Sequence, residues 1–189
     1  WATWAAAWAT FGLVLLASYV RTGAWTPSLF AASIVAVGCR DFVSARPATL
    51  GFLCMAALSL LLGVLQTRGG HDRWWPVAGL VPVLLLWGAA HGSFTLGYGL
   101  AALFVVHGLV VRGRRRGEAA PDGRRLAVIA AALTACLAAT VLLGPYGASA
   151  LTHGEKIAGS RAFRTVAEWC SPLARAGYPP VWRYWTILG

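Results

Sequence analysis

The sequence has 189 residues, of which 58% are hydrophobic and 12% are charged, a composition that excludes an ordinary soluble domain and indicates an integral membrane protein. The formal net charge of +10 would suit a nucleic-acid-binding protein, but six of the sixteen basic residues lie in one short segment between two apolar runs, RGRRRGEAAPDGRR. That distribution is typical of a cytoplasmic loop under the positive-inside rule, so nucleic acid is not expected as a partner.

Six apolar segments follow one another along the chain, and each is expected to form a membrane helix. They run roughly over residues 3–20, 27–39, 47–65, 76–90, 94–111 and 126–143. The second and fourth are short for a bilayer core, which needs about 20 helical residues, so they are expected to tilt, extend into their polar flanks or stop part-way. The segments are too long and too evenly apolar for barrel strands. The predicted fold class is all-α, a polytopic transmembrane helical bundle of about six spans.

Ten tryptophans are expected to mark the interfaces between the apolar core and the lipid headgroups. Most of them flank the apolar segments, at Trp1, Trp4, Trp8, Trp25, Trp74, Trp75, Trp87, Trp169, Trp182 and Trp185. The four cysteines show no paired spacing, so no disulfide or zinc site is expected. At least two of them lie in apolar runs, where a thiol packs as a small hydrophobic group.

Strict alternation of the spans predicts which loops share a side of the membrane. With the Arg112–Arg125 loop in the cytoplasm, Arg21 and the TRGGHDR loop also face the cytoplasm. The opposite side receives the CRDFVSARP segment, the turn at His91 and Gly92, and the tail from residue 144 onward. Pieces that are far apart in the sequence are therefore expected at one outer face.

The tail differs from the spans in composition. Residues 144–180 are moderately hydrophobic, and apolar residues recur there at spacings of three to six, which predicts an amphipathic segment along the membrane interface. Residues 181–189 are similar to the start of a further span. We expect a single transmembrane helical domain over residues 1–189 that is a fragment of a longer chain.

His91 is an ionisable residue at the end of an apolar run, in LLLWGAAHGSFTLG. Ionisable groups at membrane depth are costly and indicate either a functional site or a paired group. The other interpretation is a neutral histidine that hydrogen-bonds a carbonyl and helps to turn the chain between two spans. His107 is expected to be a packed or snorkelling residue near the cytoplasmic end of its span.

Two arginines and an acid lie within the outer segment RDFVSARP. Arg40 and Arg46 could together hold a lipid phosphate, because guanidinium groups bind phosphate in a bidentate manner. Asp41 could instead pair with either arginine and close the loop. Two further outer residues are candidates by position: Tyr146 in GPYG, which ends the sixth segment, and Glu168 in AEWCSP.

The order of these motifs resembles a family of bacterial inner-membrane proteins. The motifs are RP at the start of a span, LLLWGAAHGSFTLG, GPYG and AEWCSP, and they cover roughly residues 46–172. The family's version reads approximately W-A-N-x-H-G-G-F-x-x-G, then N-P-Y-G, then A-E-W-x-S-P. Its members are similar to polyprenyl-phosphate-dependent glycosyltransferases of the C-type (GT-C) membrane superfamily, relatives of protein mannosyltransferases. The resemblance implies a multi-pass protein of the bacterial inner (cytoplasmic) membrane.

The resemblance implies a carrier-lipid site at the outer face. A lipid-linked sugar phosphate would be held by Arg40 and Arg46, with His91, Tyr146 and Glu168 lining the groove above it. In such transferases the activating acid and an acidic metal-binding motif lie in the first outer loop, which would precede Trp1. No catalytic residue, metal ligand or cofactor is therefore assigned here, although the resemblance implies a divalent metal for a full-length enzyme. Asp41 is the nearest candidate acid or base, but it does not match the position of that motif.

This chain departs from the family pattern at two asparagines. The asparagine of W-A-N corresponds to Gly88 or Ala89, and the asparagine of N-P-Y-G corresponds to Gly144. Two polar side chains of the family pattern are thus missing from the outer face. These departures would suit a relative that does not catalyse transfer.

Two functions follow as expectations. The first is a membrane glycosyltransferase-like protein, or a fragment of one, that handles a polyprenyl-phosphate-linked sugar at the outer face. The alternative is a non-catalytic accessory subunit that packs against other membrane subunits through the Gly- and Ala-rich runs WATWAAAWATFG and LAVIAAALTACLAA. A small-solute transporter is disfavoured because the spans lack polar residues near the membrane midplane. Expected partners are membrane lipid, the sugar donor and, for the alternative, other subunits.

Overall fold

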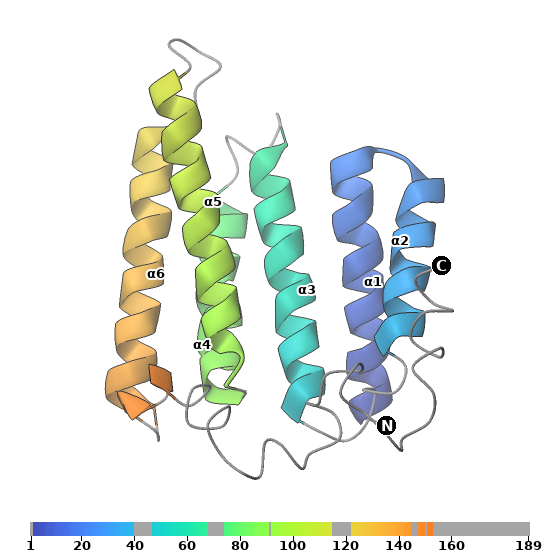
Figure 1. Cartoon of the computed structure of the whole chain (residues 1–189), viewed down its shortest axis with the longest axis horizontal. Helices are drawn as coiled ribbons and strands as arrows, with labels where there is room; N and C mark the ends of the chain where they lie inside the picture. The colour runs from blue at the N-terminus through green and yellow to red at the C-terminus, as the bar shows by residue number, and fades with distance from the viewer. Residues whose placement is uncertain are drawn as a thin grey trace, which may run out of the picture.

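The computed structural model describes residues 2–39, 47–67, 74–90, 92–114, 122–144, 147–149 and 151–152, and these residues contain helices and no strand. The helices are α1 (Ala2–Thr22), α2 (Trp25–Cys39), α3 (Pro47–Gln66), α4 (Trp75–Ala90), α5 (Phe94–Arg114) and α6 (Gly123–Leu143) (Figure 1). Each coincides with one of the six apolar segments. The prediction of an all-α fold is therefore confirmed.

Four of the helices, α1, α3, α5 and α6, are long and apolar enough to cross a membrane. The other two are shorter, with 15 residues in α2 and 16 in α4. At 1.5 Å per residue these two helices are about 22–24 Å long, which is less than the ~30 Å hydrocarbon core. The chain is therefore a helical membrane protein, and the number of its helices that cross the bilayer completely stays a prediction.

The helices run side by side along a row in which α4 lies behind α5 (Figure 1). α1 packs between α2 and α3, α3 packs on α4, and α6 covers α4 and α5. Consecutive helices run in opposite directions, so α1, α3 and α5 end where α2, α4 and α6 begin. The described helix ends that are consecutive in the sequence therefore alternate between the two ends of the row, in agreement with the alternation that the sequence predicts.

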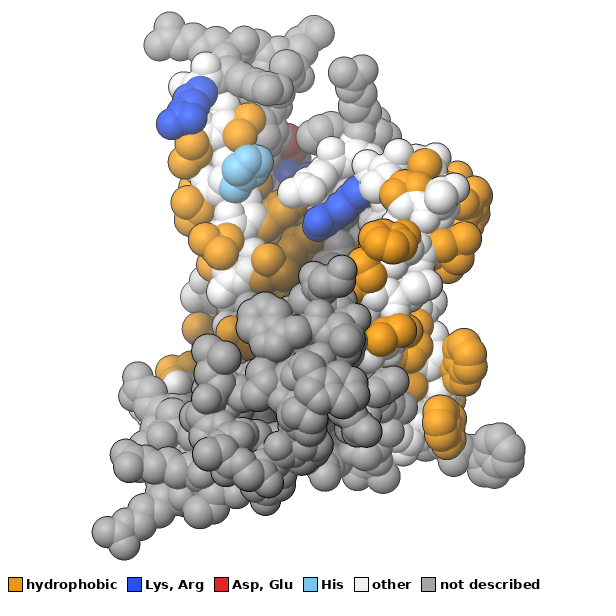
Figure 2. All heavy atoms as spheres, turned by 45° about the vertical axis from the view of Figure 1, so that its right-hand side comes forward, with side chains coloured by type: hydrophobic (Ala, Val, Ile, Leu, Met, Phe, Trp, Pro, Cys, Tyr) orange, Lys and Arg blue, Asp and Glu red, His pale blue; other side chains and the backbone are white. Residues whose placement is uncertain are grey.

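The charged residues of the described part lie at one end of the row. Its arginines are in the last turns of α1 and α5 and the first turn of α6: Arg21, Arg112, Arg114, Arg124 and Arg125. We call this end the arginine end, and the opposite end, with the α4–α5 turn and the end of α6, the turn end. In Figure 2 the visible Lys and Arg side chains gather in the upper part of the molecule. The positive-inside rule predicts that the arginine end is cytoplasmic.

The helices extend further into the arginine-rich loop than the sequence predicted. Arg112 and Arg114 belong to the last turn of α5, where a cation interacts favourably with the helix dipole. The first turn of α6 carries Arg124 and Arg125, whose positive charges interact unfavourably with the helix dipole at that end. Asp122 caps this helix by accepting a hydrogen bond of 3.0 Å from the backbone N–H of Arg124. Arg125 is only 5% exposed, and its guanidinium carbon lies 5.8 Å from the centroid of the Trp74 ring.

The main hydrophobic core is formed by α3, α4, α5 and α6. Trp87 of α4 is at its centre and only 1% exposed, so this tryptophan is a core residue and not part of an interfacial belt. The tryptophans at Trp4, Trp8, Trp25, Trp74 and Trp75 are exposed, as expected for interfacial residues. Cys54 and Cys136 are buried as free thiols within the core.

The α1–α2 connection is a tight turn at the arginine end. Gly23 has a φ of +66°, and its N–H donates to the carbonyl of Tyr19 over 2.8 Å, which ends α1. Ser28 is fully buried, and its hydroxyl donates to the carbonyl of Ala24 over 2.7 Å. The rings of Tyr19 and Trp25 stack with centroids 4.2 Å apart. These contacts hold α2 against α1.

Candidate functional site

The site residues predicted from the sequence lie outside the described part of the chain. They are Arg40, Asp41, Arg46, His91, Tyr146 and Glu168. Four of them have a described chain neighbour. α2 ends at Cys39, directly before Arg40, and α3 begins at Pro47, directly after Arg46; α4 ends at Ala90, directly before His91, and Gly147 follows Tyr146. The geometry of the turn end can therefore be built from the residues that surround these positions.

The α4–α5 turn is held by an aromatic cluster at the turn end. The indole N–H of Trp87 donates to the hydroxyl of Ser93 over 3.1 Å. The Trp87 ring lies against the backbone of Gly97, where a Cβ atom would overlap ring atoms. Phe94 and Tyr98 meet edge to face, with centroids 5.8 Å apart. LLLWGAAHGSFTLG therefore forms a helical hairpin whose two arms touch at Trp87 and Gly97.

Thr140 of α6 connects this hairpin to the end of the last helix. Its hydroxyl donates to the carbonyl of Cys136 over 2.9 Å and lies 3.4 Å from the hydroxyl of Tyr98. Because the Thr140 proton is directed to Cys136, Tyr98 is the donor in the second contact. A Cβ atom at Gly88 would come within 2.8 Å of the Thr140 side chain. Residues of α4, α5 and α6 thus converge on one threonine.

Gly144, one of the two departures from the family pattern, lies beside Thr140. Gly88 also lies beside Thr140, and it is one of the two positions, with Ala89, that can correspond to the asparagine of W-A-N. Gly88 is held close to the Thr140 side chain, so an asparagine at this position would require α4 and α6 to move apart. Gly144 ends α6 by donating its N–H to the Thr140 carbonyl over 3.1 Å, and a Cβ atom there would overlap that carbonyl oxygen. The glycines are therefore part of the packing of this chain at the turn end.

The described residues at the turn end offer hydroxyl groups and an indole N–H but no carboxylate. Asp122 is the one acidic residue in the described part of the chain, and it caps α6 at the arginine end. The same residues contain no group of His, Cys, Asp and Glu side chains that could hold a metal ion. The described part of the turn end can bind by hydrogen bonding and by aromatic contact. Acid–base chemistry would need residues from other parts of the chain.

Tyr98→Phe is expected to lower the free energy of unfolding by less than about 1 kcal/mol, because interhelical hydrogen bonds in membrane proteins contribute ~0.6 kcal/mol on average. The 3.4 Å separation from Thr140 is also long for two hydroxyl groups. Thermal unfolding in detergent, followed by circular dichroism, measures the change. Thr134→Val is the control, since the exposed Thr134 hydroxyl bonds only to Ala130 of its own helix. A decrease in the free energy of unfolding above about 2 kcal/mol would contradict the weak Tyr98–Thr140 hydrogen bond inferred from this distance.

A second feature is a groove between α1 and α3, with a volume of about 310 Å³. This volume is at the lower end of the range for small-molecule sites, about 300–1,000 Å³. Its walls include two stripes with spacings of three and four residues: Ala7, Thr10, Val14, Ala17 and Arg21 on α1, and Thr49, Phe52, Ala56 and Ser59 on α3. Such spacing places each stripe on one face of its helix. Because most of these side chains are small, the facing stripes leave space between them. The larger side chains of Phe11 and Met55, and Val35 of α2, also line the groove.

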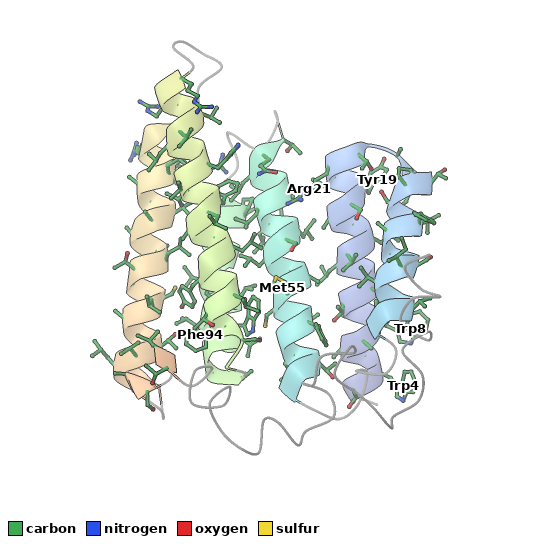
Figure 3. All side chains as sticks on the ribbon, in the orientation of Figure 1. Trp4, Trp8, Tyr19, Arg21, Met55 and Phe94 are labelled. Carbon is green, nitrogen blue, oxygen red and sulfur yellow. The ribbon has the colours of Figure 1, made fainter. Side chains whose placement is uncertain are left out.

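Arg21 is the one charged residue among the described residues that line the groove. It points from α1 toward α3, near the arginine end (Figure 3). Its side chain crosses Gly63, where a Cβ atom would lie 3.4 Å from the Arg21 Nε. The side chain is nonetheless exposed. A guanidinium group therefore stands at one end of an apolar groove, where it can reach a ligand.

The groove was not predicted from the sequence, in which Arg21 served only as a marker of topology. The matching three-and-four spacing of small residues on two of the apolar segments is the signal that could have indicated it. That signal becomes a groove only when the two stripes face each other, and the sequence does not show which helices are neighbours.

Comparisons with protein-family models, with curated proteins and with solved structures found no match to this chain. The resemblance to polyprenyl-phosphate-dependent glycosyltransferases therefore stays a prediction from the motifs.

Proposed function

We propose that this chain is a membrane glycosyltransferase-like protein, or part of one, that handles a polyprenyl-phosphate-linked sugar at its turn end. The observation that carries the proposal is the meeting of two motifs around Thr140. LLLWGAAHGSFTLG contributes Gly88, and Tyr98 is the residue directly after it. The segment that ends in GPYG contributes Thr140 itself and Gly144. Motifs that are about 50 residues apart in the sequence thus pack against each other at the turn end, which supports a shared site formed by the residues next to them.

The distribution of charge supports an outer location for that surface. The arginines of the described residues are all at the opposite end of the row, and short loops rich in arginine stay in the cytoplasm. The turn end would then face the outside of the bacterial inner membrane. The predicted phosphate-binding pair, Arg40 and Arg46, lies in the segment between the end of α2 and the start of α3, and both of these helix ends are at the turn end.

The proposed role is binding and orientation of the carrier lipid. Arg40 and Arg46 would neutralise the lipid phosphate, which also stabilises that phosphate as a leaving group. His91, Tyr146 and Glu168 would line the space above it, and Asp41 is the acid closest to the arginines in the sequence. In this proposal the packed residues of the turn end, such as Trp87 and Thr140, would support these groups.

A photoactivatable polyprenyl phosphate is the direct test. We expect it to label peptides that contain the α4–α5 turn and the end of α6, and we expect polyprenyl phosphate to compete better than the uncharged polyprenol. The double variant Arg40→Gln/Arg46→Gln should lower labelling by about tenfold or more, because hydrogen bonds to charged groups contribute about 1.5–3 kcal/mol each.

Arg114→Gln is the matched control for this experiment, because Arg114 is an exposed arginine at the arginine end. It should leave labelling unchanged. Equal labelling of the two ends, or labelling that survives in the double variant, would contradict the proposed function.

An accessory subunit is the second candidate, and one observation favours it. α6 carries an exposed stripe of small residues at Ala127, Ala131, Ala135 and Ala138, and small residues allow close contact between membrane helices. A second membrane protein that co-purifies at a fixed ratio, without labelling by the lipid probe, would favour this function over lipid handling.

A further inference from the structure

We infer that the groove between α1 and α3 binds an acyl chain of an anionic phospholipid, with the lipid phosphate at Arg21. This second lipid site is independent of the proposed function, because its proposed phosphate contact is at the arginine end and it uses none of the residues that are assigned to the carrier lipid. The inference rests on the apolar lining of the groove, on its length and on the position of its single cation.

The lining suits a hydrocarbon chain. Ala7, Val14, Ala17 and Ala56 contribute apolar surface. The hydroxyl of Thr10 donates to the carbonyl of Ala6 over 2.8 Å, so it is satisfied within its own helix and needs no polar ligand. A polar solute would lose hydration in such a groove without replacement of its hydrogen bonds, whereas an acyl chain loses nothing.

The length of the groove also fits a lipid chain. From Ala7 to Arg21 the lining covers fourteen residue steps of α1, which is about 21 Å of helix. One leaflet contributes about 15 Å of hydrocarbon thickness. A chain whose headgroup is at the arginine end can therefore lie along the groove over the full depth of its leaflet.

The charge of Arg21 selects the headgroup. No hydrogen bond or ion pair joins Arg21 to the other residues that the structure describes, and its side chain is exposed at the end of the groove. Ser18 and Ser59, one from each helix, also line the groove and can add hydroxyl donors. An arginine at a membrane surface contributes about 1 kcal/mol to the binding of anionic lipid. The geometry thus favours a lipid with a phosphate and a net negative charge.

Native mass spectrometry of the delipidated full chain in detergent tests the inference. The ligands are phosphatidylglycerol, phosphatidylcholine and diacylglycerol with identical acyl chains, and we expect affinity to fall in that order. Arg21→Gln should weaken phosphatidylglycerol binding about fivefold and leave diacylglycerol binding unchanged. Arg21→Lys should retain most of the affinity because it keeps the charge.

Arg124→Gln is the matched control, since Arg124 is an exposed arginine of the same end on α6 and does not line the groove. Ser59→Phe and Val14→Phe fill the groove from either helix and should weaken all three lipids. Unchanged helical circular dichroism shows that each variant is folded. Equal losses in Arg21→Gln and Arg124→Gln, diacylglycerol binding as tight as that of phosphatidylglycerol, or full affinity in both folded Phe variants would overturn the inference.

Discussion

Replacing Trp87 by alanine is expected to lower the free energy of unfolding by about 3–5 kcal/mol, the range measured for large aromatic residues in protein cores. Trp87 is only 1% exposed and belongs to the core cluster of α3–α6. Its removal leaves a cavity beside Gly97 and frees the hydroxyl of Ser93 from its indole donor. Thermal or denaturant unfolding in detergent, followed by circular dichroism, measures the loss.

Trp8→Ala is the matched control for Trp87→Ala. Trp8 is 73% exposed and lies near the turn end of α1 (Figure 3), so its removal opens no cavity in the protein. The change in unfolding free energy should stay within about 0.5 kcal/mol. Equal effects of the two substitutions would contradict the assignment of Trp87 to the core and would restore the interfacial role that the sequence indicated.

Gly97→Ala is expected to lower the free energy of unfolding by about 1–3 kcal/mol, because the added methyl group overpacks the core. A Cβ atom at this position overlaps the ring of Trp87, and the ring cannot swing aside because it is buried on α4. The same unfolding measurement applies. Partial separation of α4 and α5 should also raise the exposure of the Trp87 ring.

Gly99→Ala serves as the control on the same helix. An added Cβ atom at Gly99 meets nothing within 4 Å, so this substitution should be neutral or slightly stabilising, by up to about 1 kcal/mol of helix propensity. A double-mutant cycle provides the sharper test. In a Trp87→Ala background the Gly97→Ala substitution should cost little, because the cavity accepts the methyl group. Simple additivity of the two losses would contradict the contact.

The glycines around Thr140 occupy places in this chain where the packing leaves no room for a larger side chain. Gly88 is in close contact with the Thr140 side chain, and Gly144 uses its N–H to end α6. An asparagine at position 88 would need a wider spacing between α4 and α6, whereas a side chain at position 144 would meet the Thr140 carbonyl of its own helix. If the carrier-lipid site is present, its polar contacts must come from Arg40, Arg46 and the other predicted residues rather than from these two positions.

The sequence by itself determined the fold class and the helix positions. Runs such as residues 94–111 and 126–143 are uniformly apolar, and a backbone in lipid must satisfy its own hydrogen bonds, so helices follow from composition alone. The alternation of loops, with Arg21 and Arg112 at one end, follows from the number of helices between them. The end of α5 and the start of α6 do not follow from the apolar runs, because arginines and the capping residue Asp122 extend these helices into a polar loop.

Only the tertiary structure decided which helix faces meet. From its position near the end of an apolar segment, Trp87 is expected at the membrane interface. It is buried instead, because Gly97 of the next helix leaves space for its ring. Arg21 is a topology marker in the sequence, yet it stands at the end of a groove because α3 presents small residues and Gly63 to α1. In both cases the neighbour comes from another helix. Helical periodicity defines the faces of one helix, but the partner of each face depends on packing across the bundle.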